Sequence, residues 1–382
     1  MAPSAHDILR KIREGEALSA LLLSEICLEK TVIDGARLTD CDLSKSRFMG
    51  AVLRSGEFTG STFDGADFRY ADLRESAFRE ARFHGASLSF ARLDGADLEN
   101  ADLSGCEIEK AGFTGTLLSG ARFTEATLVD VDLATSSSFE GVSFAEADLD
   151  SVLFAGLRAT GLDLSDAFLR LVSFRGATLE DGSFRGCRLQ RSSFEACRGR
   201  RLVFAEARAI GTSFARAELE RADFAGAILE DCTFDGATLS GATLRRAKLT
   251  DGSRAVGAKL DRADLTEARL DEIDLTESSL EAAILERASL RGAVLERASL
   301  RRASLAEADL CGARLEGCDL REARLRGALL DWQALRCARF ESADLIGARL
   351  RGPAADGNEG AERVIDEELA IELERLARTR AD

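Results

Sequence analysis

The sequence predicts an all-β fold, a parallel β-helix, because large and small apolar residues recur with a period of five. Residues 288–310 read ASLRGAVLERASLRRASLAEADL, with leucine at every fifth position and alanine two places before each leucine. A helix requires apolar residues about every 3.6 positions, and a half-buried strand requires them at every second position. A five-residue period fits neither element and indicates a chain that bends at each repeat.

The five-residue repeat runs through most of the chain. Large apolar residues, here called centres, occupy every fifth position in three runs, which are Ile33 to Leu133, Phe139 to Leu249 and Leu260 to Leu350. The three runs hold 63 repeats, and the frame shifts by one residue between successive runs. The centres that are small are Ala159, Gly199 and Ala209. Such regularity predicts one continuous repeat architecture.

Two inward positions in every five, one large and one small, describe the wall of a four-cornered coil. Four corners close a coil of about 20 residues, and neighbouring coils would pair backbone to backbone at about 4.8 Å, as strands do. At four repeats a coil, the chain would make about 16 coils. A helical alternative fails because Gly and Ser recur within every turn and no 3.6-residue stripe exists.

The repeats resemble a known family. ADLTEARLDE, ADLENADLSG and ADLCGARLEG match the A(D/N)LXX pattern of the pentapeptide-repeat proteins. The resemblance covers about residues 18 to 352. It implies the right-handed quadrilateral β-helix of that family, and it implies much less about function, because one fold hosts many functions.

Both ends of such a stack need a cap, because unpaired strand edges template aggregation. Residues 1–17 are predicted to form an N-terminal capping helix, with Ile8, Leu9 and Ile12 on its apolar side. Residues 18–352 are predicted to form the β-helix itself.

Residues 353–382 are predicted to be a linker followed by an amphipathic helix over residues 361–380. Its apolar stripe is Ile365, Leu369, Leu373 and Leu376. Members of the resembled family often dimerise end to end through their C-terminal coils and helix, so the resemblance implies a homodimer here. A helix that caps only its own chain is the alternative.

Trp332, the only tryptophan, falls on an outward position two residues past the centre Leu330, and Leu329 lies close by in the sequence. Its predicted neighbours one coil away on either side are Gly312 and Gly352, which would leave a shallow groove beside the indole. Aromatic anchors are typical of interface centres. We therefore predict that Trp332 and Leu329 join the C-terminal stripe at an interface, covered by the C-terminal helix or by a second chain.

The cysteine pattern argues against a metal site. Six cysteines fall on the small inward position, namely Cys41, Cys106, Cys187, Cys197, Cys232 and Cys318, where cysteine acts as a slightly larger alanine. Cys27, Cys311 and Cys337 fall on outward positions as free thiols, which fits a reducing compartment. With no CxxC spacing and two histidines, no metal and no cofactor are expected.

Catalysis is not expected either. The carboxylates fall on outward positions of a convex surface, without a pocket that would shift their pKa values. The glycines follow the five-residue period, so no phosphate-binding loop is indicated. No uninterrupted apolar run reaches membrane-spanning length and the N-terminus has no signal core, so we expect a cytoplasmic protein without a membrane span.

The net charge of −16 is unevenly distributed, since residues 34–150 hold 22 acidic and 11 basic residues. Direct nucleic-acid binding is not expected at this charge, without a basic face and with almost no exposed aromatic residues. Steps of 20 residues along one face give the mixed column Asp42, Thr62, Arg82, Asp102, Arg122. Such columns predict paired ladders in which each ion pair contributes little.

These features predict a non-enzymatic interaction scaffold, a rigid acidic rod that binds a protein partner. The resemblance implies one alternative, a DNA mimic that binds DNA gyrase or another topoisomerase and confers quinolone or toxin resistance, because acidic members of the family act in this way. It implies another, a component or effector of a bacterial secretion system, because these repeats recur there. The partner itself is not named by the sequence.

Overall fold

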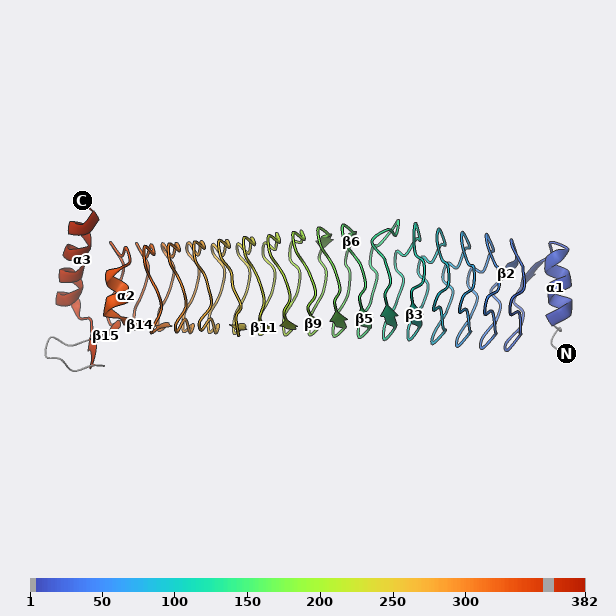
Figure 1. Ribbon diagram of the computed structural model, residues 1–382, viewed down its shortest axis with the longest axis horizontal. Coiled ribbons are helices and arrows are strands. Elements are labelled where there is room, and N and C mark those ends of the chain that lie inside the picture. The colour runs from blue at the N-terminus through green and yellow to red at the C-terminus, as the bar shows by residue number, and fades with distance from the viewer. Residues whose placement is uncertain (1–4, 353–360, 382) are drawn as a thin grey trace. The chain divides into compact units, whose positions relative to one another are not determined.

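The computed structural model describes residues 5–352 and 361–381, and the chain forms two compact units, Met1–Arg188 and Leu189–Asp382. Each unit is a stack of coils of a right-handed quadrilateral parallel β-helix (Figure 1), so the predicted fold class is confirmed. The chain makes about 17 turns. This is one more than predicted, because Leu18, Leu23 and Leu28 are already buried centres ahead of Ile33.

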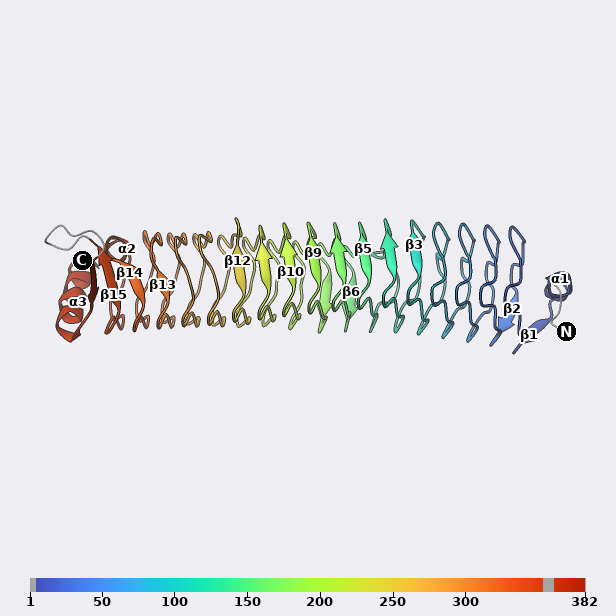
Figure 2. The same ribbon diagram turned by 90° about the horizontal axis from the view of Figure 1, so that it is seen from below.

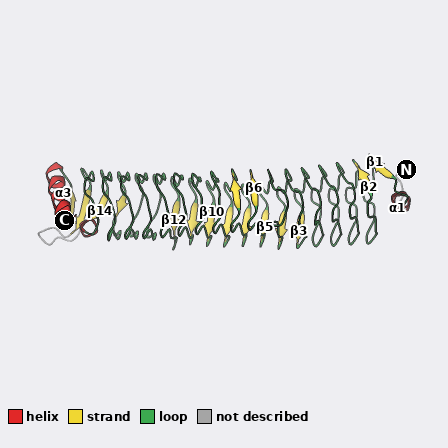
Figure 3. Cartoon of the chain, turned by 90° about the horizontal axis from the view of Figure 1, so that it is seen from above, coloured by secondary structure: helices red, strands yellow, loops and turns green. Residues whose placement is uncertain are grey.

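Successive coils are joined by parallel backbone pairing at a step of about 20 residues. The N–H of Leu300 donates to the carbonyl oxygen of Asp319 at 2.8 Å, and the N–H of Asp319 donates to the carbonyl oxygen of Ala298 at 2.9 Å. Within each unit, neighbouring coils therefore lie side by side in both views (Figure 1, Figure 2). Most residues of a coil lie in turns and single bridges, and strands are short (Figure 3).

The strands of the first unit pair in parallel, β1 with β2, β6 with β8, and β3, β4, β5 and β7 in that order. They are β1 (Ala17–Ser19), β2 (Arg37–Thr39), β3 (Glu107–Glu109), β4 (Thr127–Val129), β5 (Asp148–Asp150), β6 (Arg158–Thr160), β7 (Phe168–Arg170) and β8 (Thr178–Glu180). β9 (Arg188–Gln190) lies where the first unit ends and the second begins.

In the second unit β10, β11 and β12 pair in parallel, and so do β13, β14 and β15. These strands are β10 (Arg208–Ile210), β11 (Ile228–Glu230), β12 (Lys248–Thr250), β13 (Asp309–Leu310), β14 (Leu329–Asp331) and β15 (Arg349–Gly352). Each of these strands contains one buried centre, such as Leu229, Leu249 or Leu330, which points into the coil.

Corner residues adopt left-handed backbone angles, and they are often not glycine. Lys30, Tyr70 and Arg262 have φ values of 53°, 61° and 59°. A left-handed residue with a side chain costs about 1 kcal/mol or more. The corner N–H is hydrogen-bonded to the next coil, as that of Arg262 is to the carbonyl oxygen of Glu281 at 2.9 Å, which offsets the strain. Corner side chains consequently form regular outward columns.

The large centres fill the interior. Leu300 is fully buried, and phenylalanines one coil apart stack on each other. The ring centroids of Phe48 and Phe68 lie 4.6 Å apart in the first unit, and those of Phe204 and Phe224 lie 4.8 Å apart in the second. These distances match the spacing of neighbouring strands, about 4.8 Å, so aromatic stacking reinforces the backbone pairing between coils.

Polar residues at the small inward position are satisfied by the backbone of neighbouring coils. The hydroxyl of Ser61 donates to the carbonyl oxygen of Leu38 at 2.7 Å and accepts the N–H of Cys41 at 3.0 Å. A buried hydroxyl with both partners costs little. Serine therefore substitutes for alanine in the wall.

Both frame shifts are one-residue insertions, as predicted. The step between paired residues rises to 21 at each of them, as in Thr127 with Asp148 and Thr233 with Arg254. At the first insertion the buried Ser136 hydroxyl has no hydrogen-bond partner in the described part of the chain. The wall therefore accommodates an inserted residue without losing coil pairing.

The N-terminal cap is a short helix, α1 (Ala5–Arg13), as predicted. Ile8 and Ile12 are buried, and the N–H of Gly15 donates to the carbonyl oxygen of Ile12 at 2.9 Å. Gly15 has a φ of 76°, the left-handed angle that commonly ends a helix. The Arg37 side chain of the next coil donates to the carbonyl oxygen of Gly15 at 3.0 Å, which ties the cap to the stack.

The C-terminal end differs from the prediction in two places. A short helix, α2 (Trp332–Arg336), interrupts the repeat inside a coil, although Leu335 still serves as its buried centre. The predicted helix over residues 361–380 begins later than expected. Residues 361–364 form strand β16 (Ala361–Val364), which pairs antiparallel with β15 and covers the last open edge.

Helix α3 (Glu367–Ala381) follows directly after β16. Asp366 caps its first turn, because the carboxylate of Asp366 accepts the N–H of Leu369 at 2.8 Å. The stack therefore ends in a strand and a helix of the same chain.

Candidate interaction surfaces

The interior of each unit holds thiols that are chemically inert. The six inward cysteines are buried as predicted. Burial raises the pKa to about 12 for Cys106, Cys197, Cys232 and Cys318. Of the three outward cysteines, Cys27 and Cys337 are exposed. Cys311 is a free thiol as predicted, but it is only 6% exposed because the Arg351 side chain lies over it and donates to its Sγ at 3.4 Å.

A thiol-labelling experiment checks these placements. In the native protein, Cys27 and Cys337 are expected to react rapidly with an aromatic disulfide reagent, and Cys311 slowly. Buried thiols with raised pKa values present almost no thiolate at neutral pH, so the inward cysteines should react only after unfolding. Peptide mapping of the labelled sites gives the answer, and rapid native labelling of Cys187 would contradict the inward assignment.

The outer wall of each unit carries ion pairs between neighbouring coils. The predicted mixed column is confirmed, since Asp42, Thr62, Arg82 and Asp102 pair successively across coils. Asp102 also accepts a hydrogen bond from the Arg122 side chain at 3.1 Å. The arginine of this pair is largely exposed, so the pair contributes little to stability. Its effect is to cancel charge locally on an acidic wall.

Several carboxylates on the wall have lowered pKa values. Hydrogen bonds from Arg69, Arg74 and Arg321 lower the pKa values of the carboxylates that accept them. Those carboxylates are Asp67, Asp72 and Asp319. A carboxylate whose pKa is lower in the folded than in the unfolded chain stabilises the fold above the unfolded value. That stabilisation is lost as the pH falls through the folded value.

We therefore expect the free energy of unfolding to fall below about pH 4, as several small contributions are lost together. Urea unfolding at pH 7, 5 and 3, followed by circular dichroism, measures it. Asp72→Asn, which cannot ionise, should show a smaller loss between pH 5 and pH 3 than the unchanged chain. An identical loss in both would mean that Asp72 and Arg74 contribute nothing.

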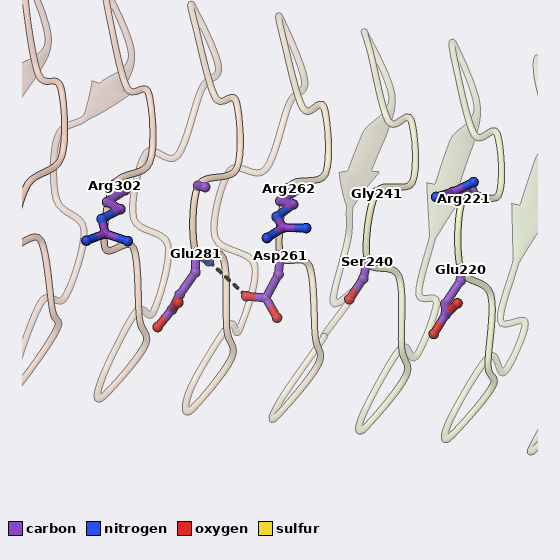
Figure 4. A pocket seen from close by; sticks show the side chains of 9 residues that line it. Glu220, Arg221, Ser240, Gly241, Asp261, Arg262, Glu281 and Arg302 are labelled. Carbon is purple, nitrogen blue, oxygen red and sulfur yellow. Dashed lines mark hydrogen bonds between the residues drawn. The ribbon is translucent and has the colours of Figure 1, made fainter.

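A trough in the second unit lies between two rows of charged side chains (Figure 4). It has a volume of about 540 Å³ and draws two residues from most of the coils that it crosses. Its lining residues are Glu220, Arg221, Ser240, Gly241, Asp261, Arg262, Glu281, Ala282 and Arg302. Arginines from the corners form one row, and the residues just before the corners form a second row of carboxylates with one hydroxyl.

The trough exists because large and small residues alternate along the corner column. Gly241 and Ala282 separate the arginines, and the aliphatic part of Arg221 lies 3.6 Å from where a Cβ of Gly241 would be. Arg302 is paired with Glu322 at 2.7 Å, whereas Arg221 makes no ion pair within the described part of the chain. The same holds for Arg262. The trough therefore offers two unneutralised guanidinium groups beside a row of carboxylates.

An exposed aromatic pair in the first unit was not expected from the sequence. Tyr70 is 61% exposed and stacks on Phe90, with ring centroids 4.9 Å apart. Among the described Phe, Tyr and Trp residues Tyr70 is the one with an exposed side chain, so the expectation of almost no exposed aromatic residues is confirmed with this exception. The signal that could have found the pair is the spacing of 20 residues between two aromatic residues on outward positions.

The residues of the predicted C-terminal interface differ in how far they are buried. Ile365 is 1% and Leu373 is 2% exposed, and the N–H of Ile365 donates to the carbonyl oxygen of Ala348 at 2.8 Å. Both side chains are thus covered by their own chain. Leu329 and Leu369 are half-buried, and the side chain of Leu376 lies outside the described residues.

Trp332 is half-buried at the start of α2, and its Cβ lies 3.0 Å from where a Cβ of Gly352 would be. The prediction that Gly352 lies beside Trp332 is therefore confirmed. A cover over Trp332, from α3 or from a second chain, stays a prediction.

Within the described ranges, no helix is long and apolar enough to cross a membrane, and no three His, Cys, Asp or Glu side chains converge as a metal site would require.

A solenoid with a filled interior and charged outer columns defines a repeat protein. Family comparisons agree. The model for pentapeptide repeats matches residues 31–69, 66–105, 258–297, 279–317 and 313–352, and the model for a pentapeptide repeat region matches residues 167–244. The chain belongs to the pentapeptide-repeat proteins.

The chain is similar to several solved structures. HetL, a protein involved in heterocyst differentiation regulation in Nostoc sp. strain PCC 7120, is 22% identical, with 94% of this chain and 99% of HetL covered and a TM-score of 0.15. Rfr23 from the cyanobacterium Cyanothece 51142 is 20% identical, with 32% and 97% covered and a TM-score of 0.30.

QnrB1, a plasmid-mediated fluoroquinolone resistance protein, is 17% identical, with 55% of this chain and 93% of QnrB1 covered and a TM-score of 0.21. Identities and TM-scores this low say nothing about function. A comparison with curated protein sequences finds no match.

Proposed function

We propose that the protein is a non-enzymatic scaffold that binds a protein partner through the charged columns of its outer wall. The observation that carries the proposal is the trough in the second unit, where Arg221 and Arg262 stand unneutralised opposite carboxylates. At other places on the wall, as at Asp102 and Arg122, opposite charges are paired and neutralise each other. Unpaired charges at fixed positions favour one complementary partner and suppress others.

The regular backbone supports a binding role. Corner residues are held by hydrogen bonds between coils, so the guanidinium groups of the trough start from fixed Cα positions. The wall would therefore lose less conformational freedom when a partner binds than a mobile loop would. The cytoplasm is the proposed location, because all nine cysteines are free thiols.

Capture from the host cell with a charge-reversed trough tests this function. The unchanged chain, the variant Arg221→Glu with Arg262→Glu, and a control are each cross-linked in cells, and bound proteins are quantified by mass spectrometry. The control is Arg287→Glu with Arg297→Glu, which changes the net charge equally but lies outside the trough.

The expected result is that one host protein is captured by the unchanged chain and by the control but not by the trough variant. The binding of that host protein to the chain is then reproduced with purified components. A reversed charge pair at a specific interface typically costs tenfold or more in affinity, about 1.4 kcal/mol. Equal capture by all three chains would contradict a role of the trough.

A DNA mimic that binds DNA gyrase is the second candidate, favoured by the acidic excess of residues 34–150. The interleaved bases in the column through Arg82 and Arg122 weigh against it, because DNA presents an unbroken row of negative charge. Supercoiling and cleavage assays with purified gyrase decide the matter. Inhibition at stoichiometric protein would support the mimic, and unchanged supercoiling would exclude it.

A further inference from the structure

The stacked rings of Tyr70 and Phe90 in the first unit, here called the aromatic ladder, have one outer ring face that no described side chain covers. Tyr70 stacks on Phe90 with ring planes only 6° apart, so the other face of the Tyr70 ring points to the preceding coil. The corner of that coil is Gly50, whose N–H donates to the carbonyl oxygen of Arg69 at 2.9 Å. Because Gly50 has no side chain, the face of the Tyr70 ring stays uncovered, which explains why Tyr70 is 61% exposed.

The other end of the ladder is closed. The Nζ atom of Lys110 lies 5.9 Å from the ring centroid of Phe90, within the range of a cation–π contact. Lys110 is held there by Glu109 at 3.1 Å and by Asp130 at 3.6 Å. Only the Tyr70 end is therefore ready to accept another ring.

Tyr70 and Gly50 form a projection and a hollow one coil apart on the same edge, and that combination is self-complementary. A two-fold axis between them would place Tyr70 of each chain over Gly50 of the other, with the coils antiparallel. The stack would then continue through four rings from the two chains. The ring spacing of 4.9 Å matches the coil spacing of about 4.8 Å, so the side chains of the two edges stay in register.

The same axis brings Lys30, the corner next to Gly50, over Phe90 of the other chain. The Cγ of Lys30 lies 3.5 Å from where a Cβ of Gly50 would be, so the Lys30 side chain swings out of the space beside Gly50 when this contact forms. Lys30 makes no ion pair within the described part of the chain, so its ammonium group is free for a second cation–π contact. Each chain would supply one such contact to the other.

The surroundings of the ladder suit contact between two copies of an acidic chain. Val32 is 59% exposed on the adjacent column and pairs with the half-buried Val52, so this column is apolar at two consecutive coils before it continues with Asp72 and Arg92. Three pairs of charged neighbours neutralise each other, Arg54–Asp34, Arg69–Asp67 and Arg74–Asp72, at 2.6 to 2.7 Å. A second copy therefore meets this edge without the repulsion that the net charge of −16 would cause elsewhere.

We propose that this edge is an isologous self-association surface, on which Tyr70 of each chain packs over Gly50 and against Tyr70 of a second, antiparallel copy. An isologous contact closes after two chains and does not propagate. The surface lies far along the sequence from the C-terminal end, and it does not depend on the trough of the second unit.

Sedimentation equilibrium of the full chain over a range of concentrations tests the proposal. The average mass should rise from 41.1 kDa towards twice that value. Tyr70→Ser removes the projection, and Gly50→Lys fills the hollow at a corner type that accepts lysine at Lys30 and Lys110. Each is expected to weaken association about tenfold or more, as loss of a central aromatic anchor does.

The matched control is Leu171→Ser, which removes another exposed apolar corner residue of the first unit away from the ladder. It should associate like the unchanged chain, and so should Val364→Asp with Ile371→Asp, which alters the exposed face of α3 and leaves the cap in place. Thermal unfolding confirms that each variant is folded. A monomer at all concentrations, or association lost in Val364→Asp with Ile371→Asp but kept in Tyr70→Ser, would overturn the proposal.

A photo-cross-linking phenylalanine analogue at position 70 tests the geometry. In a mixture of isotopically labelled and unlabelled chains, cross-links between chains should map to residues around Gly50. Cross-links between chains that map only to other regions would contradict the antiparallel arrangement.

Discussion

Leu300→Asp is expected to unfold or fray the second unit. Leu300 is fully buried, and so are Leu280 and Leu320, the centres one coil before and after it. Truncating a buried leucine costs about 2–5 kcal/mol, and burying a carboxyl group without a partner adds several kcal/mol. The sum approaches the whole stability of an ordinary domain. A large drop in melting temperature, measured by circular dichroism, is the expected result.

Arg301→Gln is the matched control, one residue further along the chain. Arg301 is 38% exposed and bonds to Glu322 at 2.6 Å, and Glu322 keeps Arg302 as a partner at 2.7 Å when Arg301 is changed. Surface substitutions of this kind rarely change stability much. Equal losses of melting temperature in both variants would refute the inward and outward assignment of the repeat.

The fold was predictable because inward positions obey a strict period. A large centre every fifth residue determines which side chains are buried, whatever the neighbouring coils contain. Leu300 and Phe204 were placed correctly for this reason, and so were the insertions at the two frame shifts. The N-terminal cap was predictable too, because Ile8 and Ile12 form a helical stripe ahead of the repeat.

The surfaces were harder to predict, because the contacts and the exposure of an outward side chain depend on the residues of the coils beside it. Cys311 is covered by Arg351, 40 residues away, and no local pattern indicates that contact. Tyr70 and Phe90 meet only because the coil step is 20 residues. Residues 361–364 form a strand because an open edge is present to pair with, although their local sequence continues into a helix.

A double substitution at the C-terminal end, Ile365→Asp with Leu373→Asp, is expected to open the cap. Both side chains are at most 2% exposed, so each buried carboxyl group costs several kcal/mol. Release of β16 would leave the edge of β15 unpaired, and unpaired edges associate. Light scattering should show larger species. The emission of Trp332, which lies beside Gly352 in β15, should shift to the red while the melting of the remaining coils persists.

The control for this prediction is Val364→Asp with Ile371→Asp, which places the same charges on the other side of the same elements. Val364 is 59% and Ile371 is 56% exposed, so an own-chain cap tolerates both changes. A dimer through the C-terminal helix would not tolerate them, because it would have to bury this exposed face. A cap that opens only in the first variant therefore identifies α3 as a cap of its own chain. If instead the control variant halves the mass of a dimer, the outer face of α3 is the site where a second chain binds.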